Sequence, residues 1–238
     1  MAINPITEVL SLRDRAYEEI KKNILGLGLE PGQFLSIGDL ARQLSVSRTP
    51  VRDALIQLER EGWVKVLPFK GAYVSFISVK DVEDIFELLI VLDGQIARSA
   101  AGKFSDIDIE KAEALLARSR ETIAAGRVAD ARKLGAEFHS LIESVADNQR
   151  MLDIIKQLRQ QYVRIRHFAS AVPDRVQLSY EQHSGVLEAI KAREPERAQK
   201  LMMEHQTSVR DSILATLKAM EERAPLKGTS SGKKPKVA

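Results

Sequence analysis

The segment "SVSRTPVRDALIQLEREGWVKV", Ser45 to Val66, places two arginines four residues apart at the start of a helical pattern. Its apolar residues recur at i, i+3, i+4 and i+7, the spacing of one buried helix face: Val51, Ala54, Leu55 and Leu58. Ser47 is placed to cap this helix, because a serine hydroxyl accepts a hydrogen bond from the first backbone amides. Arg48, Thr49 and Arg52 then lie at its N-terminal end, and the surrounding fold decides whether they form a solvated edge or a DNA-reading surface.

A shorter helix precedes this one. Ser36 and Asp39 have capping-box spacing at the start of "GDLARQL", and "SVS" separates the two helices. Ser11 and Asp14 open an earlier helix in the same way. Two short helices joined by a few residues, with basic and hydroxyl side chains at the start of the second, predict a helix-turn-helix motif. In that motif arginine at the start of the second helix bonds guanine bidentately or binds phosphate.

After this motif the apolar period changes from helical to two. "WVKVLPFKGAYVSF", Trp63 to Phe76, predicts a β-hairpin with Lys70-Gly71 at its tip. A basic tip suits a wing that contacts backbone phosphate. Three helices and a hairpin predict a winged helix-turn-helix domain over residues 1–79. A solvated edge remains the alternative for two arginines alone, but the whole combination favours DNA binding by Ser47, Arg48, Thr49, Arg52, Lys70 and Gly71.

The stretch "LARQLSVSRTPVRDALIQLEREGWVKVLPFKGAYV" resembles the winged-helix half of the GntR family of bacterial transcriptional regulators, with "VSRTPVRDAL" as its most specific part. The resemblance implies that Arg48 and Arg52 contact bases and phosphates, with Thr49 beside them. It also implies that Gly71 is the wing-tip glycine. Many members have a DNA-contacting arginine at the position of Gly38, so its absence here implies a different operator preference.

Residues 80–222 show helical periodicity throughout. The first stretch has a long apolar stripe at Val82, Ile85, Leu89, Leu92 and Ile96. The sequence predicts further helices over about 106–125, 128–146, 149–170, 177–193 and 195–222. No alternating strand pattern follows Phe76. The expected fold is therefore mainly α, with an antiparallel bundle of about six helices after the winged helix.

Three of the four histidines lie on or beside the apolar stripe of a different helix. His139 lies beside its stripe, on the face of Gly135 and Ile142, whereas His183 and His205 lie on theirs. A neutral imidazole is a good ligand for Zn, Ni, Fe or related ions, and helix bundles often hold such sites. The three histidines could be hydrogen-bonded core residues or a metal site. Helical phase shows which way each side chain points but not how far apart the side chains lie.

The segments "EFHSLIESVADN", "EQHSGVLEAIKARE" and "AQKLMMEHQ" resemble the histidine-bearing blocks of the FCD ligand-binding domain, found in the FadR-like branch of the GntR family. The resemblance implies a divalent metal such as Zn or Ni at His139, His183 and His205. It also implies that this metal anchors the carboxylate of a small organic-acid effector. Gly135 stands at the family's aspartate ligand, so a water, an effector carboxylate or a nearby side chain would have to complete the set.

One arginine and one arginine cluster of the helical domain are candidates for a role. Arg98, in "DGQIARSAA", matches a recurrent family arginine, which implies a charge-assisted bond to the effector. The alternative is that Arg98 pairs with a helix-surface acid such as Asp93 or forms no fixed pair. The cluster "RQQYVRIRHF", with Arg159 and two further arginines, is interpreted as a solvated helix face.

The expected function is a ligand-responsive transcriptional regulator, a repressor that binds a palindromic double-stranded DNA operator. A homodimer is expected because two-fold symmetry doubles the few DNA contacts of one winged helix. The protein is not expected to be an enzyme. A metal-dependent hydrolase using the three histidines is one alternative, but Glu137 lies on a different helical face from His139 and offers no general base. A DNA-packaging protein is the other.

Composition bounds these hypotheses. The net charge is +3, and residues 223–238 contribute five Lys/Arg and no acidic residue in a Gly-, Ser- and Pro-rich tail that is expected to be disordered. There is no cysteine, which excludes disulfides and thiolate metal sites. No apolar run approaches the ~18–20 residues of a membrane span, and no secretory signal is visible. A cytoplasmic, nucleoid-associated protein with no membrane partner is therefore expected.

Overall fold

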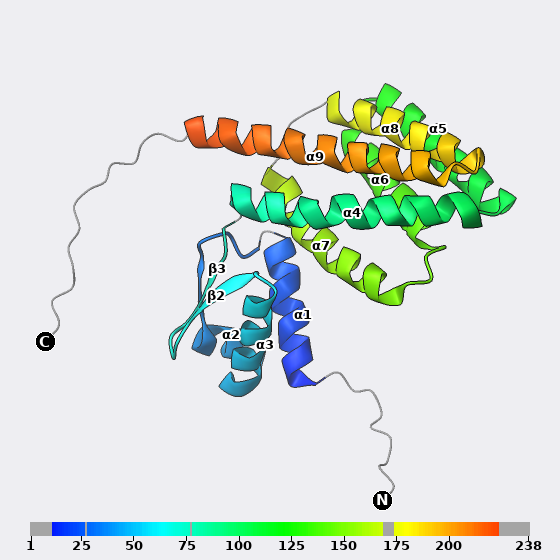
Figure 1. Ribbon diagram of the computed structural model, residues 1–238. Helices are drawn as coiled ribbons and strands as arrows, with labels where there is room; N and C mark the ends of the chain where they lie inside the picture. Colours follow the sequence, from blue (N-terminus) through cyan, green and yellow to red (C-terminus); the bar gives the residue numbers. More distant parts are fainter. Residues whose placement is uncertain (1–10, 27, 77, 169–173, 224–238) are drawn as a thin grey trace, which may run out of the picture. The chain divides into compact units, whose positions relative to one another are not determined.

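The computed structural model describes residues 11–26, 28–76, 78–168 and 174–223, which form two compact units divided between Ser78 and Val79. The first unit contains α1 (Leu12–Leu25), β1 (Phe34–Ser36), α2 (Ile37–Gln43), α3 (Arg48–Arg60), β2 (Val64–Leu67) and β3 (Gly71–Val74), as labelled in Figure 1. The tail expected over 223–238 lies outside the described residues, apart from Arg223 at the end of α9.

The helix starts of the first unit follow from local capping. Ser11 and Ser36 accept hydrogen bonds from the backbone amides of Asp14 and Asp39, as their spacing predicts. Ser47 is the N-cap residue of α3, but its side chain makes no capping hydrogen bond. Its hydroxyl is therefore not engaged in holding the helix start.

The predicted hairpin is present as β2 and β3, and β1 adds a third antiparallel strand beside β3, which gives the order β1-β3-β2. β1 spans only three residues, too few to show an alternating pattern. Gly71 is the first residue of β3 rather than the tip. Its φ is 151°, and a Cβ there would lie 2.1 Å from the carbonyl oxygen of Leu35, so only glycine lets β1 approach. The turn at the tip is formed by residues 68–70.

The core of the first unit lies between α1, α3 and the sheet, and includes Ile20, Ile24, Leu55, Leu58 and Trp63. These burials confirm the predicted apolar face of α3, and they direct its opposite, charged face outward.

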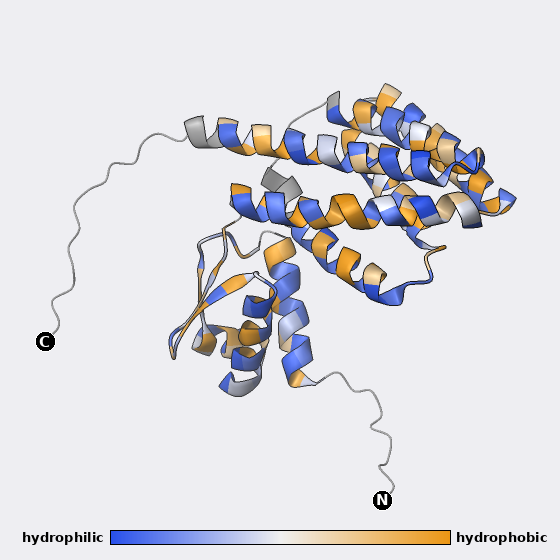
Figure 2. Ribbon diagram, in the orientation of Figure 1, coloured by the Kyte–Doolittle hydropathy of each residue, from blue (hydrophilic) through white to orange (hydrophobic). Residues whose placement is uncertain are grey.

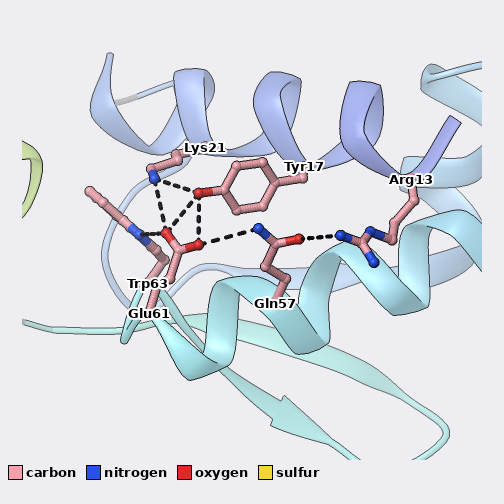
Figure 3. Close-up of polar contacts among 6 residues, drawn as sticks. All are labelled: Arg13, Tyr17, Lys21, Gln57, Glu61 and Trp63. Atoms are coloured by element: carbon pink, nitrogen blue, oxygen red, sulfur yellow. Dashed lines mark hydrogen bonds and ion pairs between the residues drawn. The ribbon is translucent and has the colours of Figure 1, made fainter. Parts of the chain in front are cut away.

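A polar network also joins α1 to the end of α3 (Figure 3). The Glu61 carboxylate accepts hydrogen bonds from Tyr17 Oη at 2.7 Å, Lys21 Nζ at 2.9 Å and Trp63 Nε1 at 3.0 Å. Lys21 is buried, and Nζ also lies 5.1 Å from the centroid of the Trp63 ring. The network therefore satisfies a buried ammonium group and fixes α3 relative to α1.

The second unit is an all-helical bundle of α4 (Val79–Lys103), α5 (Asp106–Ala124), α6 (Val128–Glu143), α7 (Gln149–Phe168), α8 (Asp174–Lys191) and α9 (Pro195–Arg223). These six helices of the described segments match the predicted bundle, although α8 begins three residues before the expected position. α9 runs back along α4 in the opposite direction (Figure 1), and the middle of α4 is its most apolar part (Figure 2). None of the described helices is both long and apolar enough to span a bilayer.

Candidate DNA-binding surface and effector site

The start of α3 presents an exposed, basic surface. Ser47, Arg48, Thr49 and Arg52 are all exposed, while Val51 between them is fully buried. Within the described part of the chain, neither guanidinium forms an ion pair with a carboxylate. Both cations are therefore open to an anion from outside the unit, which suits base edges and phosphates of DNA.

Gly38 at the start of α2 lies next to this surface. A Cβ at Gly38 would stand 3.8 Å from Nη2 of Arg48. The Arg48 guanidinium thus lies beside the position where many related proteins are expected to have arginine. An arginine at position 38 would add a second cation to this surface, so the chain presents one cation where that arginine would give two.

The wing contributes two exposed lysines. Lys65 lies on β2 opposite Tyr73 of β3, and Lys70 lies in the turn between these strands. Gly71, by contrast, is buried against β1. Any DNA contact at Gly71 would therefore involve its backbone only.

In the helical unit, His139 of α6, His183 of α8 and His205 of α9 are buried and converge. Nε2 of His183 lies 3.2 Å from Nε2 of His139 and 3.1 Å from Nε2 of His205, and one nitrogen from each ring falls within 4.8 Å of the others. Burial lowers the pKa of His183 to about 3 and lowers the pKa of His139 and His205 well below 6.5. All three rings are therefore neutral at physiological pH.

This donor set fits a divalent metal. Neutral imidazole nitrogen is a good ligand, and two nitrogens bound at ~2.0–2.1 Å to one tetrahedral ion would lie about 3.3 Å apart, close to the two distances that His183 makes with His139 and His205. Nδ1 of His205 lies 2.9 Å from Oε1 of Gln182. Donation of this N–H fixes the tautomer and leaves Nε2 as an electron-pair donor toward the other histidines.

The histidines line a cavity of about 140 Å³ that also contains Gly135, Arg159 and Arg175. Arg175 donates to Ser208 Oγ at 3.1 Å and to Gln182 Oε1 at 3.3 Å, and among the described residues it has no carboxylate partner. Burial lowers the pKa of Arg175 from 12.5, but a guanidinium stays charged at neutral pH. The cavity therefore has positive charge that an anionic guest would neutralise.

Arg159 is not on a solvated face, which corrects the sequence interpretation. It is mostly buried, and its Nη2 lies 3.0 Å from the buried carboxylate of Asp93 and 2.6 Å from that of Glu143. Asp93 also accepts a hydrogen bond from Gln206, the neighbour of His205 in α9. Burial raises the pKa of Asp93, and the Arg159 charge acts against that rise. The group links α4, α6, α7 and α9 beside the cavity.

Arg98 does not line this cavity. Its guanidinium donates to Glu196 at 2.7 Å and to Gln199 at 3.3 Å, on the first turns of α9. Asp93, considered as its partner in the sequence, pairs with Arg159 instead. The structure therefore brings the three predicted histidines together and leaves the predicted arginine outside their cavity.

Sequence reasoning missed the roles of Asp93, Arg159, Arg175 and Gln182. A signal existed for two of them: Asp93 is four residues after Leu89, and Arg159 is four residues after Ile155, so each interrupts the apolar stripe of its helix. A charge inside such a stripe points to a buried partner of opposite sign. Arg175 gave no such signal, because α8 begins before its recognisable apolar pattern.

Comparisons with known proteins agree with this architecture. Residues 12–74 match the bacterial regulatory proteins of the gntR family, and residues 84–208 match the FCD domain. The chain is 26% identical over 211 residues to the HTH-type transcriptional repressor RspR of Escherichia coli, covering 89% of this chain and 91% of that protein. It is 27% identical over 190 residues to the Nta operon transcriptional regulator of Aminobacter aminovorans, covering 79% and 88%.

A third relative is the HTH-type transcriptional repressor NanR of Cronobacter sakazakii, 26% identical over 236 residues, covering 89% of this chain and 87% of that protein. Among solved structures, E. coli McbR/YncC has the same fold, with a TM-score of 0.68 and 21% identity over 88% of this chain and all of that chain.

A winged helix whose third helix presents exposed arginines, followed in the chain by a helical bundle with a histidine-lined cavity, defines a DNA-binding regulator with a ligand-binding domain. The chain belongs to the GntR family of transcriptional regulators, in the group with an FCD domain. The family and the relatives are transcriptional regulators and not enzymes. The comparisons therefore give no support to a metal-dependent hydrolase at the three histidines.

Proposed function

We propose that this protein represses transcription as a homodimer on a palindromic operator and leaves the operator when a small organic acid binds to its helical domain. The observation that carries the DNA-binding part is the pair of exposed guanidiniums of Arg48 and Arg52, neither of which has an acidic partner among the described residues. The relatives RspR and NanR are named as repressors, which supports the sign of regulation. Such a regulator would act in the cytoplasm, with the nucleoid.

We assign the base and phosphate contacts to the start of α3. Arg52 is one helical turn beyond Arg48, so both reach along the same edge of the helix. Ser47 and Thr49 offer hydroxyls to phosphate, and the Ser47 hydroxyl is not used as a cap. Lys70 in the wing adds a phosphate contact, and Gly71 acts through its backbone.

In the helical domain we propose that His139, His183 and His205 hold a divalent ion such as Zn or Ni. Such an ion, when bound, attracts a carboxylate oxygen of the effector. Gly135 leaves space on the same cavity wall, since a Cβ there would be 3.5 Å from a carbon of the His183 ring. Arg175 would bind a second carboxylate of the effector, because its charge has no acidic partner among the described residues.

We propose that Arg159 transmits effector binding to α4. Arg159 lines the cavity and at the same time pairs with Asp93 of α4, the helix that directly follows the DNA-binding unit in the chain. An anionic guest competes with Asp93 and Glu143 for the Arg159 guanidinium. Weakening this pair would change the packing of α4, and a ligand shifts an equilibrium only through such differential contacts.

The Arg52→Ala substitution tests the DNA-binding assignment. We expect a loss of roughly 5- to 150-fold in affinity for the selected operator, with an unchanged melting temperature, because one bidentate base contact is removed from an exposed position. Arg60→Ala is the matched control, since Arg60 is an exposed cation at the other end of the same helix. Equal losses for both variants in fluorescence anisotropy at physiological salt would contradict the assignment.

A further inference from the structure

The turn at the tip of the wing contains a residue that the fold does not require. Phe69, between Pro68 and Lys70, has a φ of 63°, in the left-handed region that favours glycine and asparagine. A bulky side chain in this conformation strains the backbone, and such strain persists at sites where it serves a function. The turn itself would form more easily with Asn or Gly at this position.

The same side chain is almost completely exposed. Phe69 is 97% exposed, more than any other large hydrophobic side chain of the described segments; Phe76 is next at 73%. The Phe76 ring lies against Gly32, within 2.5 Å of where a Cβ would stand, whereas Phe69 has no ring contact with another aromatic of the described chain. The Phe69 side chain therefore contributes nothing to the core, and its aromatic ring is left for a partner.

The location of Phe69 indicates that this partner is DNA. β2 and β3 follow α3 in the chain, and β2 packs against α3. Because the major and minor grooves of B-DNA alternate across the backbone, a wing beside a helix in the major groove would meet the backbone and then the minor groove. Lys70, adjacent in sequence and exposed, would hold the tip against a phosphate. A phenylalanine offers no hydrogen bond to a base edge, but apolar side chains enter the minor groove by wedging between base pairs.

We propose that Phe69 is an apolar wedge that partly unstacks one base step in the minor groove next to each half-site and kinks the operator. Pyrimidine–purine steps open most easily, so the wedge would favour TA or CA at that position. The wing would thus read sequence through DNA deformability, in addition to the base contacts from α3. This inference uses only the DNA binding of the family and is independent of the effector, the metal and the sign of regulation.

The experiment compares full-length wild type with Phe69→Asn, Phe69→Leu and Lys70→Ala on a duplex selected from a random library by the wild-type protein. 2-Aminopurine is placed at each base of the flank in turn, and the DNA end-to-end distance is followed by energy transfer. Wild type is expected to raise 2-aminopurine fluorescence at one step and to shorten the end-to-end distance, since the kinked step is unstacked.

Phe69→Asn is expected to bind about tenfold more weakly, because loss of one aromatic–base contact has an effect of this size. It should abolish both optical signals and keep the wild-type dependence of log affinity on log salt. Phe69→Leu should retain part of both signals, since it is still an apolar wedge. Lys70→Ala should reduce the salt slope by about 1 and keep the unstacking signal.

The folded state is not at risk in Phe69→Asn, because asparagine adopts this φ more easily than phenylalanine. The proposal is overturned if Phe69→Asn binds and bends the operator as wild type does. It is also overturned if this variant changes self-association of the protein and leaves the DNA signals intact, since Phe69 would then contact a second copy. Failure of Arg52→Ala to affect binding would instead contradict the α3 assignment, so the two results are separable.

Discussion

At the residue scale, Gly135 is the main departure from the family pattern in the proposed effector site. The chain has three inward histidines but no carboxylate at the position four residues before His139, and the described residues contain no acidic group close enough to join the cluster. Three neutral imidazoles leave the full charge of a divalent ion uncompensated. An effector carboxylate would therefore provide both a ligand and the missing negative charge, so metal and effector should bind cooperatively.

The Gly135→Asp substitution tests this role. The side chain has room, since a Cβ would make only an ordinary contact with His183, and the introduced carboxylate would lie one turn from His139. We expect zinc to bind roughly tenfold more tightly without effector, a change of about 1.4 kcal/mol, and added carboxylates to bind more weakly. Competition with a chromogenic chelator measures the first effect and calorimetry the second. Gly135→Asn keeps the shape without the charge, and tighter zinc binding by both variants would contradict the charge argument.

At the scale of elements, helical phase predicted the three histidines but not the groups that surround them. Phase shows which face of a helix is buried, so His139, His183 and His205 could be placed inward from sequence. It does not show which residue lies opposite. Arg159 was assigned to a surface, although it lies in the stripe of Ile155 and Tyr162, because the Asp93 that neutralises it is 66 residues away in the chain.

The contact between α1 and α3 gives a second prediction at this scale. Glu61→Gln should lower the free energy of unfolding of the first unit by about 1–2 kcal/mol, because the buried Lys21 ammonium loses its carboxylate partner. The loss stays this small because Glu61 is partly exposed, so water replaces part of the lost interaction. Urea unfolding followed by the fluorescence of Trp63, the single tryptophan, measures this unit selectively. Asp39→Asn, at an exposed ion pair with Arg42, should have a much smaller effect.

The same variant predicts a pH dependence. Burial would raise the pKa of Glu61, but the hydrogen bonds from Lys21 and Tyr17 outweigh it and hold the pKa below the ordinary value of 4.5. The stabilisation from a depressed carboxyl pKa is present above the unfolded value and is lost as the pH falls through the folded value. The difference in stability between wild type and Glu61→Gln should therefore shrink below about pH 4.5. A constant difference from pH 7 to pH 3.5 would refute the charge-based account.

At the scale of the whole molecule, the proposed repression and release would require coupling between the histidine cavity and the proposed DNA-binding surface. Coupling between two sites is reciprocal, so operator DNA must weaken effector binding by the same factor by which effector weakens operator binding. Typical coupling free energies of ~1–3 kcal/mol correspond to factors of ~5–150.

The test uses calorimetry of the zinc-loaded protein with the carboxylate that gives the largest thermal shift. We expect the factor by which operator weakens carboxylate binding to equal the factor by which the carboxylate weakens operator binding. Asp93→Asn should reduce both factors toward one while leaving operator affinity without effector close to wild type, because it removes the charge that Arg159 would exchange for the guest. Glu204→Gln is a control, since Glu204 is an exposed carboxylate on α9 whose partner is the surface residue Lys200. An unchanged coupling factor in Asp93→Asn would exclude Arg159 as the transmitting group.

The sequence by itself determined the features that depend on near neighbours in the chain. These are the helix starts at Ser11 and Ser36, the buried face of α3 with its arginines outside, and the inward direction of the three histidines. Only the tertiary structure decided which distant groups meet. It paired Arg159 with Asp93, put Arg175 rather than Arg98 on the histidine cavity, and added β1 to the wing over Gly71. The physical reason is that periodicity and capping act over one or two helical turns, whereas the partner of a buried charge or strand edge is chosen by packing of the whole chain.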